Sequence, residues 1–201
     1  MQGAYKSASK TSSDRILEFD LKSELSHGVK VSNLAYDLAK ELMLPHDVCY
    51  ELAIAGMLHD IGKLKLTGYI NGQERNPLVI EELKYVRMHP KLGYEELKGQ
   101  GYSDFILESI LYHHENYDGS GYPYNFVGEE IPIGARILRI CDVFAALSSD
   151  RSYRKAFDQD TVMELMIEEV KNFDMKVFLA FQRVVHKENE KGTVPGKGQA
   201  K

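Results

Sequence analysis

The 201-residue sequence has little of several features that mark particular protein classes. Its only cysteines, Cys49 and Cys141, lie far apart and form no CxxC pair, which argues against a disulfide scaffold and a zinc ribbon. No apolar run approaches the roughly 20 residues that cross a bilayer, and residues 1–13 lack the hydrophobic core of a signal peptide. The formal net charge of −5 provides no basic field for long nucleic acid. We therefore expect a cytoplasmic protein with neither a membrane nor a long nucleic acid as its partner.

Apolar residues in the interior of the chain recur at helical spacing. Val31, Leu34, Leu38 and Leu42 lie three or four residues apart, which places them on one face of a helix. A hydrophobic content of 43% is enough to fill one core of moderate size. We predict an all-α fold, a single compact domain of about eight helices. The expected helices cover residues 14–25, 26–42, 46–58, 77–88, 104–114, 131–149, 160–172 and 174–187.

Capping residues support several of these helices. Ser26, Ser103 and Asp160 are each suited to accept a hydrogen bond from a free amide at a helix start. Pro45 suits a first helical turn, where its missing donor has no cost.

Glycine, asparagine and proline mark the segments between and outside the helices. Residues 62–76 and 119–130 are predicted loops, because neither has a sustained hydrophobic period. We expect residues 1–20 to hold an N-terminal tail and the start of the first helix, and residues 188–201 to form a flexible tail. Residues 21–187 would then be one catalytic domain.

The positions of the seven histidines and of some aspartates carry the chemical information. His59 and Asp60 end a predicted helix, where an adjacent imidazole and carboxylate point about 100° apart and are able to serve two neighbouring sites. This arrangement suits a pair of metal ions bridged by an aspartate. An isolated His-Asp pair is more often a cap at a helix C-terminus, and the other histidines of the chain favour the metal site here.

Other polar residues lie at comparable places. His113 and His114 come together at a predicted helix end before a glycine-rich loop, where two imidazoles are able to approach one cation. His89 precedes a proline at an expected helix end, and His27 follows the expected cap at Ser26; each alone is also compatible with a surface histidine. Asp142 lies in an apolar stretch, where a carboxylate requires a partner or a metal, unless it is exposed on a polar stripe with Arg139.

The order of these residues resembles the HD superfamily of metal-dependent phosphohydrolases. Longer motifs narrow the resemblance to the HD-GYP domain over about residues 21–185. The motifs are HDIGK at residues 59–63, His89-Pro90, HHENYDGSGYP at 113–123, Ile131-Pro132, ARI at 135–137 and RSYRKA at 151–156. The resemblance implies a phosphodiesterase that hydrolyses cyclic di-GMP to pGpG, to GMP or to both, with a water shared by metal ions as the nucleophile.

The same resemblance implies the metal ligands. One ion would take His27, His59, Asp60 and Asp142, and the other would take Asp60, His89, His113 and His114. Asp60 would therefore bridge the two ions as a catalytic residue.

The sequence also indicates how many ions there are. Relatives with a third metal have a glutamate and a second aspartate at places that Ser23 and Ala145 occupy here, and Glu24 is about 100° away around a helix. We therefore predict two divalent transition metal ions per chain. Iron or manganese is expected, and zinc, nickel or cobalt is compatible with the same ligands.

Substrate contacts are less defined. Lys63 is expected to add a positive charge at the phosphate and to take part in catalysis. Tyr122 has two open roles, stacking on a base and organising its loop. The family resemblance suggests that Arg151, Arg154 and Lys155 contact the nucleotide, although each is also compatible with a solvated turn and Ser152 replaces the usual proline.

Two acidic residues of the glycine-rich loop have open roles as well. Glu115 and Asp118 are compatible both with orienting the ligand imidazoles and with solvated loop charges.

Several functions remain compatible with the sequence. The enzyme alternative is an HD-superfamily phosphohydrolase of another nucleotide, such as cyclic GMP-AMP. The non-enzyme alternatives are a cyclic dinucleotide-binding signalling module with low turnover and a plain helical protein with coincidental histidines. A homodimer or a signalling protein partner is also open.

Overall fold

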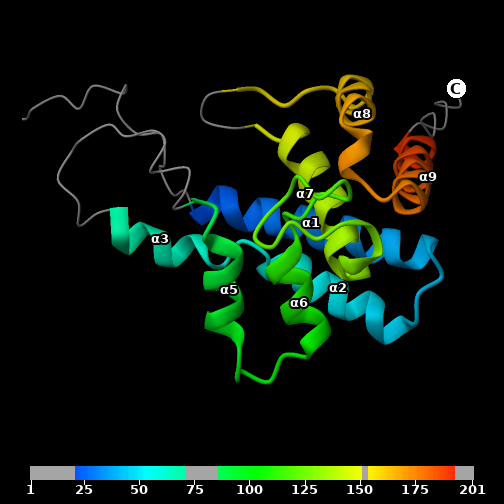
Figure 1. The fold of residues 1–201 in the computed structure, drawn as a ribbon. Helices are drawn as coiled ribbons and strands as arrows, with labels where there is room; N and C mark the ends of the chain where they lie inside the picture. Colours follow the sequence, from blue (N-terminus) through cyan, green and yellow to red (C-terminus); the bar gives the residue numbers. More distant parts are fainter. Residues whose placement is uncertain (1–20, 71–85, 151–153, 193–201) are drawn as a thin grey trace, which may run out of the picture.

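The computed structural model describes residues 21–70, 86–150 and 154–192, and the regular elements of this part are helices, without a strand. Figure 1 shows the helices gathered around α7, which comprises Ile133–Leu147. The predicted all-α fold is confirmed. None of the helices in the described part of the chain combines the length and apolar character needed to cross a bilayer.

The first two helices pack along each other. Helix α1 runs from Leu21 to Glu41 without interruption, so the prediction of a helix boundary with a cap at Ser26 was wrong. Ser26 is exposed within the helix, where its side chain faces water instead of capping, while its neighbour His27 is buried. Helix α2, His46–Leu58, has the predicted bounds, and Pro45 immediately precedes it as the N-cap residue.

Two shorter helices carry corrections to the predicted loops. Helix α3, Lys63–Ile70, lies within the predicted loop 62–76 and is anchored by the buried Leu66. Helix α5, His89–Leu97, was not predicted. Pro90 lies in its first turn, where proline is tolerated, so His89 begins a helix instead of ending one. Of the helix predicted over 77–88, residues 77–85 lie outside the described residues.

The remaining helices follow the predicted pattern with shifted ends. Helix α6, Asp104–Tyr112, is capped by Ser103 as predicted, because the Ile106 amide donates to Ser103 Oγ at 3.2 Å. Helix α8, Gln159–Glu168, is capped by Asp158 instead of Asp160, since the Thr161 amide donates to Asp158 at 3.0 Å. Helix α9, Met175–Gly192, continues past the predicted end at residue 187. Short 3-10 turns occupy Gly128–Glu130 and Val170–Asn172.

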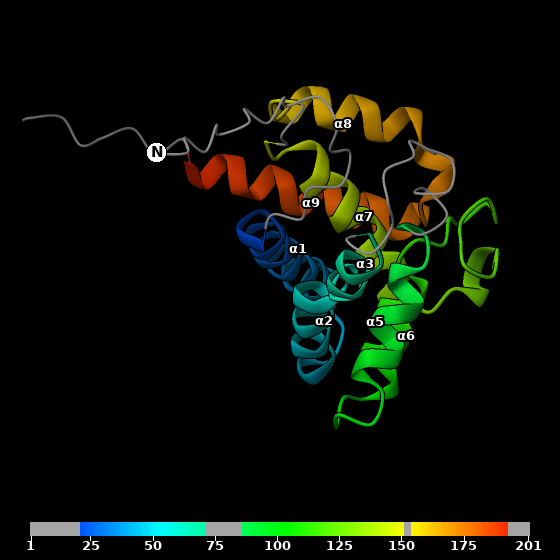
Figure 2. The ribbon, with the colours of Figure 1, turned by 90° about the vertical axis from the view of Figure 1, so that its left-hand side faces the viewer.

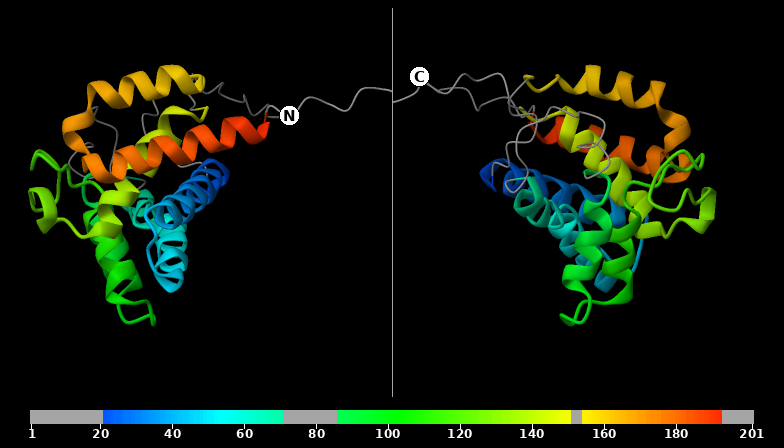
Figure 3. Two further views of the ribbon diagram at one scale, coloured as in Figure 1. Left: turned by 90° about the vertical axis from the view of Figure 1, so that its right-hand side faces the viewer. Right: turned by 60° about the vertical axis from the view of Figure 1, so that its left-hand side comes forward.

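The helices are arranged in two groups. Figure 2 shows α8 and α9 together on one side of the molecule, with α2, α5 and α6 extending to the other. The two views of Figure 3 show α5 and α6 as an antiparallel hairpin beside the pair of α1 and α2. The buried core lies between these groups and includes Leu38, Leu52, Ile110, Leu138 and Phe181. Helix α7 crosses this core and therefore brings one of its faces close to the ends of the other helices.

Candidate metal centre

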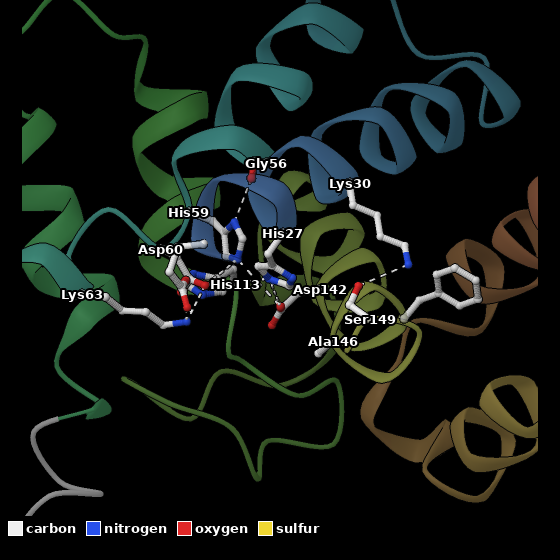
Figure 4. A network of polar contacts seen from close by, with 12 residues as sticks. His27, Lys30, Gly56, His59, Asp60, Lys63, His113, Asp142, Ala146 and Ser149 are labelled. Atoms are coloured by element: carbon white, nitrogen blue, oxygen red, sulfur yellow. Dashed lines mark hydrogen bonds and ion pairs between the residues drawn. The ribbon is translucent and has the colours of Figure 1, made fainter. Parts of the chain in front are cut away.

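The structure brings the predicted metal-ligating side chains together from five segments. Figure 4 shows five of these side chains, His27, His59, Asp60, His113 and Asp142. They come from α1, the end of α2, the start of α5, the end of α6 and the middle of α7. The contributed residues are His27, His59 with Asp60, His89, His113 with His114, and Asp142. His59 and His113 are completely buried, and His27 and His89 nearly so. Most of the cluster's side chains therefore lie at helix ends that meet in the interior.

The side chains form two neighbouring groups of donor atoms. His27, His59 and Asp142 offer atoms that lie within 4.8 Å of one another, and His89, His113 and His114 do the same. This division is compatible with the two sets of ligands that the sequence resemblance implied, and a third set of three close donor atoms, from His59, Asp60 and His113, links the two groups. Each group has the number of side chains that a metal ion needs from protein while leaving positions open.

Asp60 lies between the two groups. Its Oδ1 is 3.1 Å from Nε2 of His89 in one group. Its Oδ2 is 3.2 Å from Nε2 of His59 and 3.8 Å from Nε2 of His27 in the other. The two oxygens of one carboxylate therefore face different groups, which is the geometry that a bridging ligand requires.

Backbone carbonyls fix the orientation of three imidazoles. Nδ1 of His59 lies 2.8 Å from the Gly56 carbonyl, Nδ1 of His89 lies 2.6 Å from the Val86 carbonyl, and Nδ1 of His113 lies 2.6 Å from the Ile110 carbonyl. Because a carbonyl only accepts, the proton belongs on Nδ1 and the lone pair on Nε2. The Nε2 atoms are therefore directed into the cluster as donors to a cation.

Some of these donor atoms lack a suitable partner within the described chain. Nε2 of His89 and of His113 are 3.2 Å apart, so two lone pairs face each other when both Nδ1 atoms carry the proton. Nε2 of His59 is buried and makes no hydrogen bond, although the carboxylates of Asp60 and Asp142 lie 3.2 and 3.7 Å from it. Buried nitrogen atoms of this kind are costly unless a proton or a cation lies among them. The donor set therefore fits divalent metal ions.

The protonation states suit the same role. Burial lowers the pKa of His113 well below its ordinary value, and it lowers the pKa of His114 to about 3, so both imidazoles are neutral at pH 7. Burial opposes ionisation of Asp60 and Asp142, yet neighbouring histidines, and Lys63 at Asp60, hold the pKa of both carboxyls well below the usual range. Burial would lower the pKa of His59, but the carboxylates of Asp60 and Asp142 raise it to about 10, so in the absence of metal Nε2 of His59 carries a proton that a bound cation would displace. The carboxylates thus provide negative charge that a cation would neutralise.

Two glycines allow the segments of the cluster to approach each other. A Cβ on Gly62 would lie 2.0 Å from the His89 carbonyl oxygen, so only glycine lets the end of α2 approach the start of α5. A Cβ on Gly121 would lie 2.2 Å from the Asn116 nitrogen and 2.5 Å from the His114 carbonyl oxygen. The glycines in the HDIGK and GYP motifs are therefore explained by close backbone contact.

Lys63 contacts the proposed bridging residue. Its Nζ lies 2.5 Å from Asp60 Oδ2 and 3.4 Å from Glu24 Oε2 (Figure 4 shows the contact with Asp60). Burial lowers the pKa of Lys63, but Asp60 and Glu24 outweigh it, so the pKa is raised and the amine remains charged. Glu24 thus pairs with a lysine at the edge of the cluster. Ala145, at the place of the second aspartate in three-metal relatives, is fully buried.

Tyr122 lies against one of the histidines. Its ring stacks on the His114 imidazole with centroids 4.7 Å apart, and its amide donates to the His114 carbonyl at 3.1 Å. The Arg87 guanidinium lies over the same ring at 5.3 Å. Of the two roles considered, these contacts favour organising the loop over stacking on a base.

Glu115 and Asp118 contact the loop backbone. The buried Glu115 accepts from the Tyr124 amide at 2.6 Å. Asp118 accepts from the Ser120 amide at 2.9 Å and from the Ser120 hydroxyl at 2.6 Å. Both carboxylates therefore shape the loop that carries Tyr122.

The predicted basic contacts lie apart from the cluster or outside the described residues. Arg154 donates to the carbonyls of Ala146, Leu147 and Lys155, which satisfies free acceptors at the end of α7. Lys155 pairs with Asp150 at 3.1 Å and is highly exposed. Arg151 lies outside the described residues, so its contact with substrate stays a prediction.

Arg139 is a cation beside the cluster that was predicted only as part of a polar stripe with Asp142, without a role at the site. Arg139 lies on α7 one turn before Asp142, and its Nε donates to Asn116 Oδ1 at 2.9 Å. The spacing of three residues from Asp142 was the available signal, because residues so spaced share a helix face.

Comparison with known proteins agrees with this geometry. The family described as HD domain matches residues 11–177. The chain belongs to the HD domain family. Among relatives of this HD domain, a cyclic di-GMP phosphodiesterase of Pseudomonas aeruginosa is 37% identical over 160 residues, which cover 79% of this chain and 38% of the relative. A 3′3′-cGAMP-specific phosphodiesterase of Vibrio cholerae is 35% identical over 165 residues, again covering 79% of this chain and 38% of the relative.

Solved structures share the fold of this HD domain. An HDG"Y"P protein from Bdellovibrio bacteriovorus has a TM-score of 0.63 at 19% identity, covering 81% of this chain and 52% of that chain. The HD domain of the L. monocytogenes phosphodiesterase PgpH, in complex with cyclic-di-AMP, has a TM-score of 0.59 at 17% identity. The match covers 85% of this chain and 92% of that chain. The resemblance to HD-GYP proteins drawn from the motifs is confirmed. The chain spans about two fifths of the length of the relatives compared by sequence. Family and cluster together indicate divalent metal ions as the cofactor.

Proposed function

We propose that residues 21–187 form a catalytic domain that hydrolyses the phosphodiester bonds of cyclic di-GMP, giving pGpG, GMP or both. The observation that carries the proposal is the pair of donor groups joined by Asp60, whose two oxygens lie 3.1 and 3.2 Å from histidines of different groups. Two positions separated by one carboxylate suit a reaction in which a phosphate oxygen and an attacking water must be held together.

The chain would hold two divalent ions in the two groups. One group comprises His27, His59 and Asp142, the other His89, His113 and His114, and Asp60 would contribute to both. When bound, such ions lower the pKa of a shared water and offset charge on the phosphodiester. Iron or manganese is proposed, and zinc, nickel or cobalt fits the same nitrogen and oxygen atoms.

Residues around the donor groups would orient the ligands and neutralise the charge of the substrate phosphate. Lys63 holds Asp60 Oδ2 at 2.5 Å and would place a positive charge beside the phosphate. Tyr122, stacked on His114, would keep that imidazole and the loop mouth in position. Arg151 remains a proposed nucleotide contact. The contacts of Arg154 with carbonyls support a structural role, so its proposed contact with substrate depends on rearrangement of that turn.

The substrate is proposed from the relatives. Those named as acting on cyclic di-GMP include proteins of Pseudomonas aeruginosa and Xanthomonas campestris, each 37% identical. A relative named as specific for 3′3′-cGAMP, at 35% identity, makes that nucleotide the second candidate. The proposed compartment is the cytoplasm, consistent with two unpaired cysteines, and a homodimer or signalling partner stays open.

A substrate panel tests the proposal. The protein, freed of metal and reloaded with iron or manganese, would be incubated with cyclic di-GMP, 3′3′-cGAMP and cyclic di-AMP, and the products separated by chromatography. We expect metal-dependent conversion of cyclic di-GMP to linear pGpG or GMP at a higher kcat/KM than for the others. Faster hydrolysis of cGAMP would show that cGAMP, not cyclic di-GMP, is the substrate. Binding without hydrolysis under every metal would show that the domain is a binding module and not an enzyme.

A further inference from the structure

Arg139 is a cation that borders the metal centre without taking part in its donor groups. It lies on α7, and Asp142 follows one turn later on the same helix. Its Nε bonds to Asn116, which follows His114 by two residues. Arg139 is thus connected to both donor groups: to Asp142 of one group through α7, and to His114 of the other group through Asn116.

A chain of hydrogen bonds fixes the guanidinium in this position. Nε of Arg139 donates to Asn116 Oδ1 at 2.9 Å, and Asn116 Nδ2 donates to Ser120 Oγ at 2.9 Å. The Ser120 hydroxyl then donates to Asp118 at 2.6 Å. One edge of Arg139 is therefore anchored to the loop that carries Tyr122, which limits the freedom of the guanidinium before any ligand binds.

The opposite edge of the guanidinium is available. Among the residues that the structure describes, neither Nη atom of Arg139 has a hydrogen-bond or ion-pair partner. The Arg139 side chain is half-buried. Two adjacent N–H donors on a planar, anchored group match the spacing of two oxygens on one phosphate.

The electrostatic setting favours an anion at this edge. Burial lowers the pKa of Arg139, which means that the surrounding protein disfavours its charge, while Asp142 and Tyr122 act in the opposite direction. Two divalent ions among the donor groups would offset the charge of Asp142. Within the described residues Arg139 forms no ion pair, although the charges of Asp142 and Glu169 act on it. A half-buried guanidinium beside a cationic centre is costly to maintain unless an anion binds there.

We propose that Arg139, positioned by Asn116, binds non-bridging oxygens of the phosphodiester held at the metal centre. The inference rests on the proposed function and adds to it the residue that would contact the reacting phosphate on the side of Asp142. Lys63 lies beside Asp60, and Figure 4 shows Asp60 and Asp142 at different sides of the cluster. The two cations would therefore neutralise the phosphate from different directions.

Variants of Arg139 and Asn116 separate the effects of the guanidinium's charge, its planar geometry and its anchoring. Arg139→Gln removes the charge, Arg139→Lys keeps the charge without the planar fork, and Asn116→Ala removes only the anchor. Arg183→Gln is the matched control, because Arg183 lies exposed on α9 in a surface pair with Glu41. Bound metal and thermal midpoint would be measured for each variant, so that loss of the centre or of the fold is detected separately.

Hydrolysis of cyclic di-GMP and of bis(p-nitrophenyl) phosphate gives the first readout. We expect Arg139→Gln to lower kcat/KM for both substrates by about 100-fold with metal content unchanged, since a preorganised donor to the reacting phosphate has effects of that size. Arg139→Lys should recover part of this loss. Asn116→Ala should cause a loss of roughly tenfold that is absent when Arg139 is already Gln, because the anchor acts through the arginine. A loss confined to cyclic di-GMP would overturn the proposal and place Arg139 at a base or at the second phosphate.

Binding of inorganic phosphate gives a readout that does not depend on turnover. Calorimetry on manganese-loaded protein should show phosphate affinity about tenfold weaker in Arg139→Gln than in wild type and unchanged in Arg183→Gln. Equal affinity in Arg139→Gln and wild type would overturn the proposal. If wild type hydrolyses no cyclic dinucleotide but phosphate binding still depends on Arg139, the proposed function fails and the phosphate site remains.

Discussion

Asp60→Asn is the substitution that most sharply separates a bridged pair of ions from two independent sites. The change keeps the shape of the side chain and removes its charge. Because Oδ1 and Oδ2 of Asp60 lie 3.1 and 3.2 Å from histidines of different groups, both sites would lose the charge of a shared carboxylate, and one of them would also lose its oxygen ligand. We expect affinity to fall at least about 100-fold for each ion, since even partners that only orient a ligand contribute 10- to 100-fold.

The expected size of the effect can be worked through metal-linked stability. At a metal concentration of about 100 Kd, one ion stabilises the folded state by roughly 2.7 kcal/mol, and at about 1 Kd by roughly 0.4 kcal/mol. Asp60→Asn should therefore remove about 2.3 kcal/mol of stabilisation per ion under conditions that saturate wild type. For a chain of this size, this corresponds to a fall in Tm of roughly 5–9 °C per ion.

Metal analysis and thermal unfolding, with and without chelator, measure this effect. Wild type should hold two ions per chain and lose Tm on chelation, whereas Asp60→Asn at the same metal concentration should hold each ion at about half occupancy or less and lose only roughly 0.4 kcal/mol of stability per ion on chelation. Asp160→Asn, an exposed position on α8, controls for the change in charge. Two ions retained by Asp60→Asn at wild-type affinity would refute the bridging role. One ion retained at wild-type affinity, with the other weakened, would assign Asp60 to a single group.

Three further outcomes are expected. Gly121→Ala should lower the free energy of unfolding by about 1–3 kcal/mol in urea titration, because the new Cβ would lie 2.2 Å from the Asn116 nitrogen; an unchanged midpoint would contradict this packing. Glu24→Gln should leave two ions per chain and lower kcat less than tenfold, since Glu24 contacts Lys63 at 3.4 Å; loss of an ion would make Glu24 a ligand. His46→Ala should change neither metal content nor activity, because His46 packs on Tyr50 at the surface.

Helices with strong local signals could be predicted from the sequence. The bounds of α2 and the Ser103 cap of α6 follow from local apolar spacing and hydrogen bonding, which act within a few residues. The start of α5 could not be read in the same way, because a proline is compatible both with the end of one helix and with the first turn of the next. The uninterrupted path of α1 through Ser26 depends on packing against α2, which a capping preference does not reveal.

In the candidate site, too, some features could be predicted from the sequence and others could not. The order of the motifs was enough to assemble the histidines and aspartates that the structure brings together. Which oxygen of Asp60 faces which group, and which carbonyl fixes each imidazole, follows only from the placement of helix ends. Two arginines show what the sequence could not predict. Arg154, in a predicted substrate motif, binds backbone carbonyls, whereas Arg139, in an apolar helix, borders the metal centre. Side-chain direction, which decides between them, is a property of the folded chain.

The central claim is that the buried cluster is a two-metal centre bridged by Asp60. Anomalous diffraction at the manganese absorption edge, on crystals of the manganese-loaded protein, tests it most directly. We predict two peaks, one among His27, His59 and Asp142 and the other among His89, His113 and His114, with the Asp60 carboxylate between them. A single peak, or two peaks of which only one contacts Asp60, would contradict the claim.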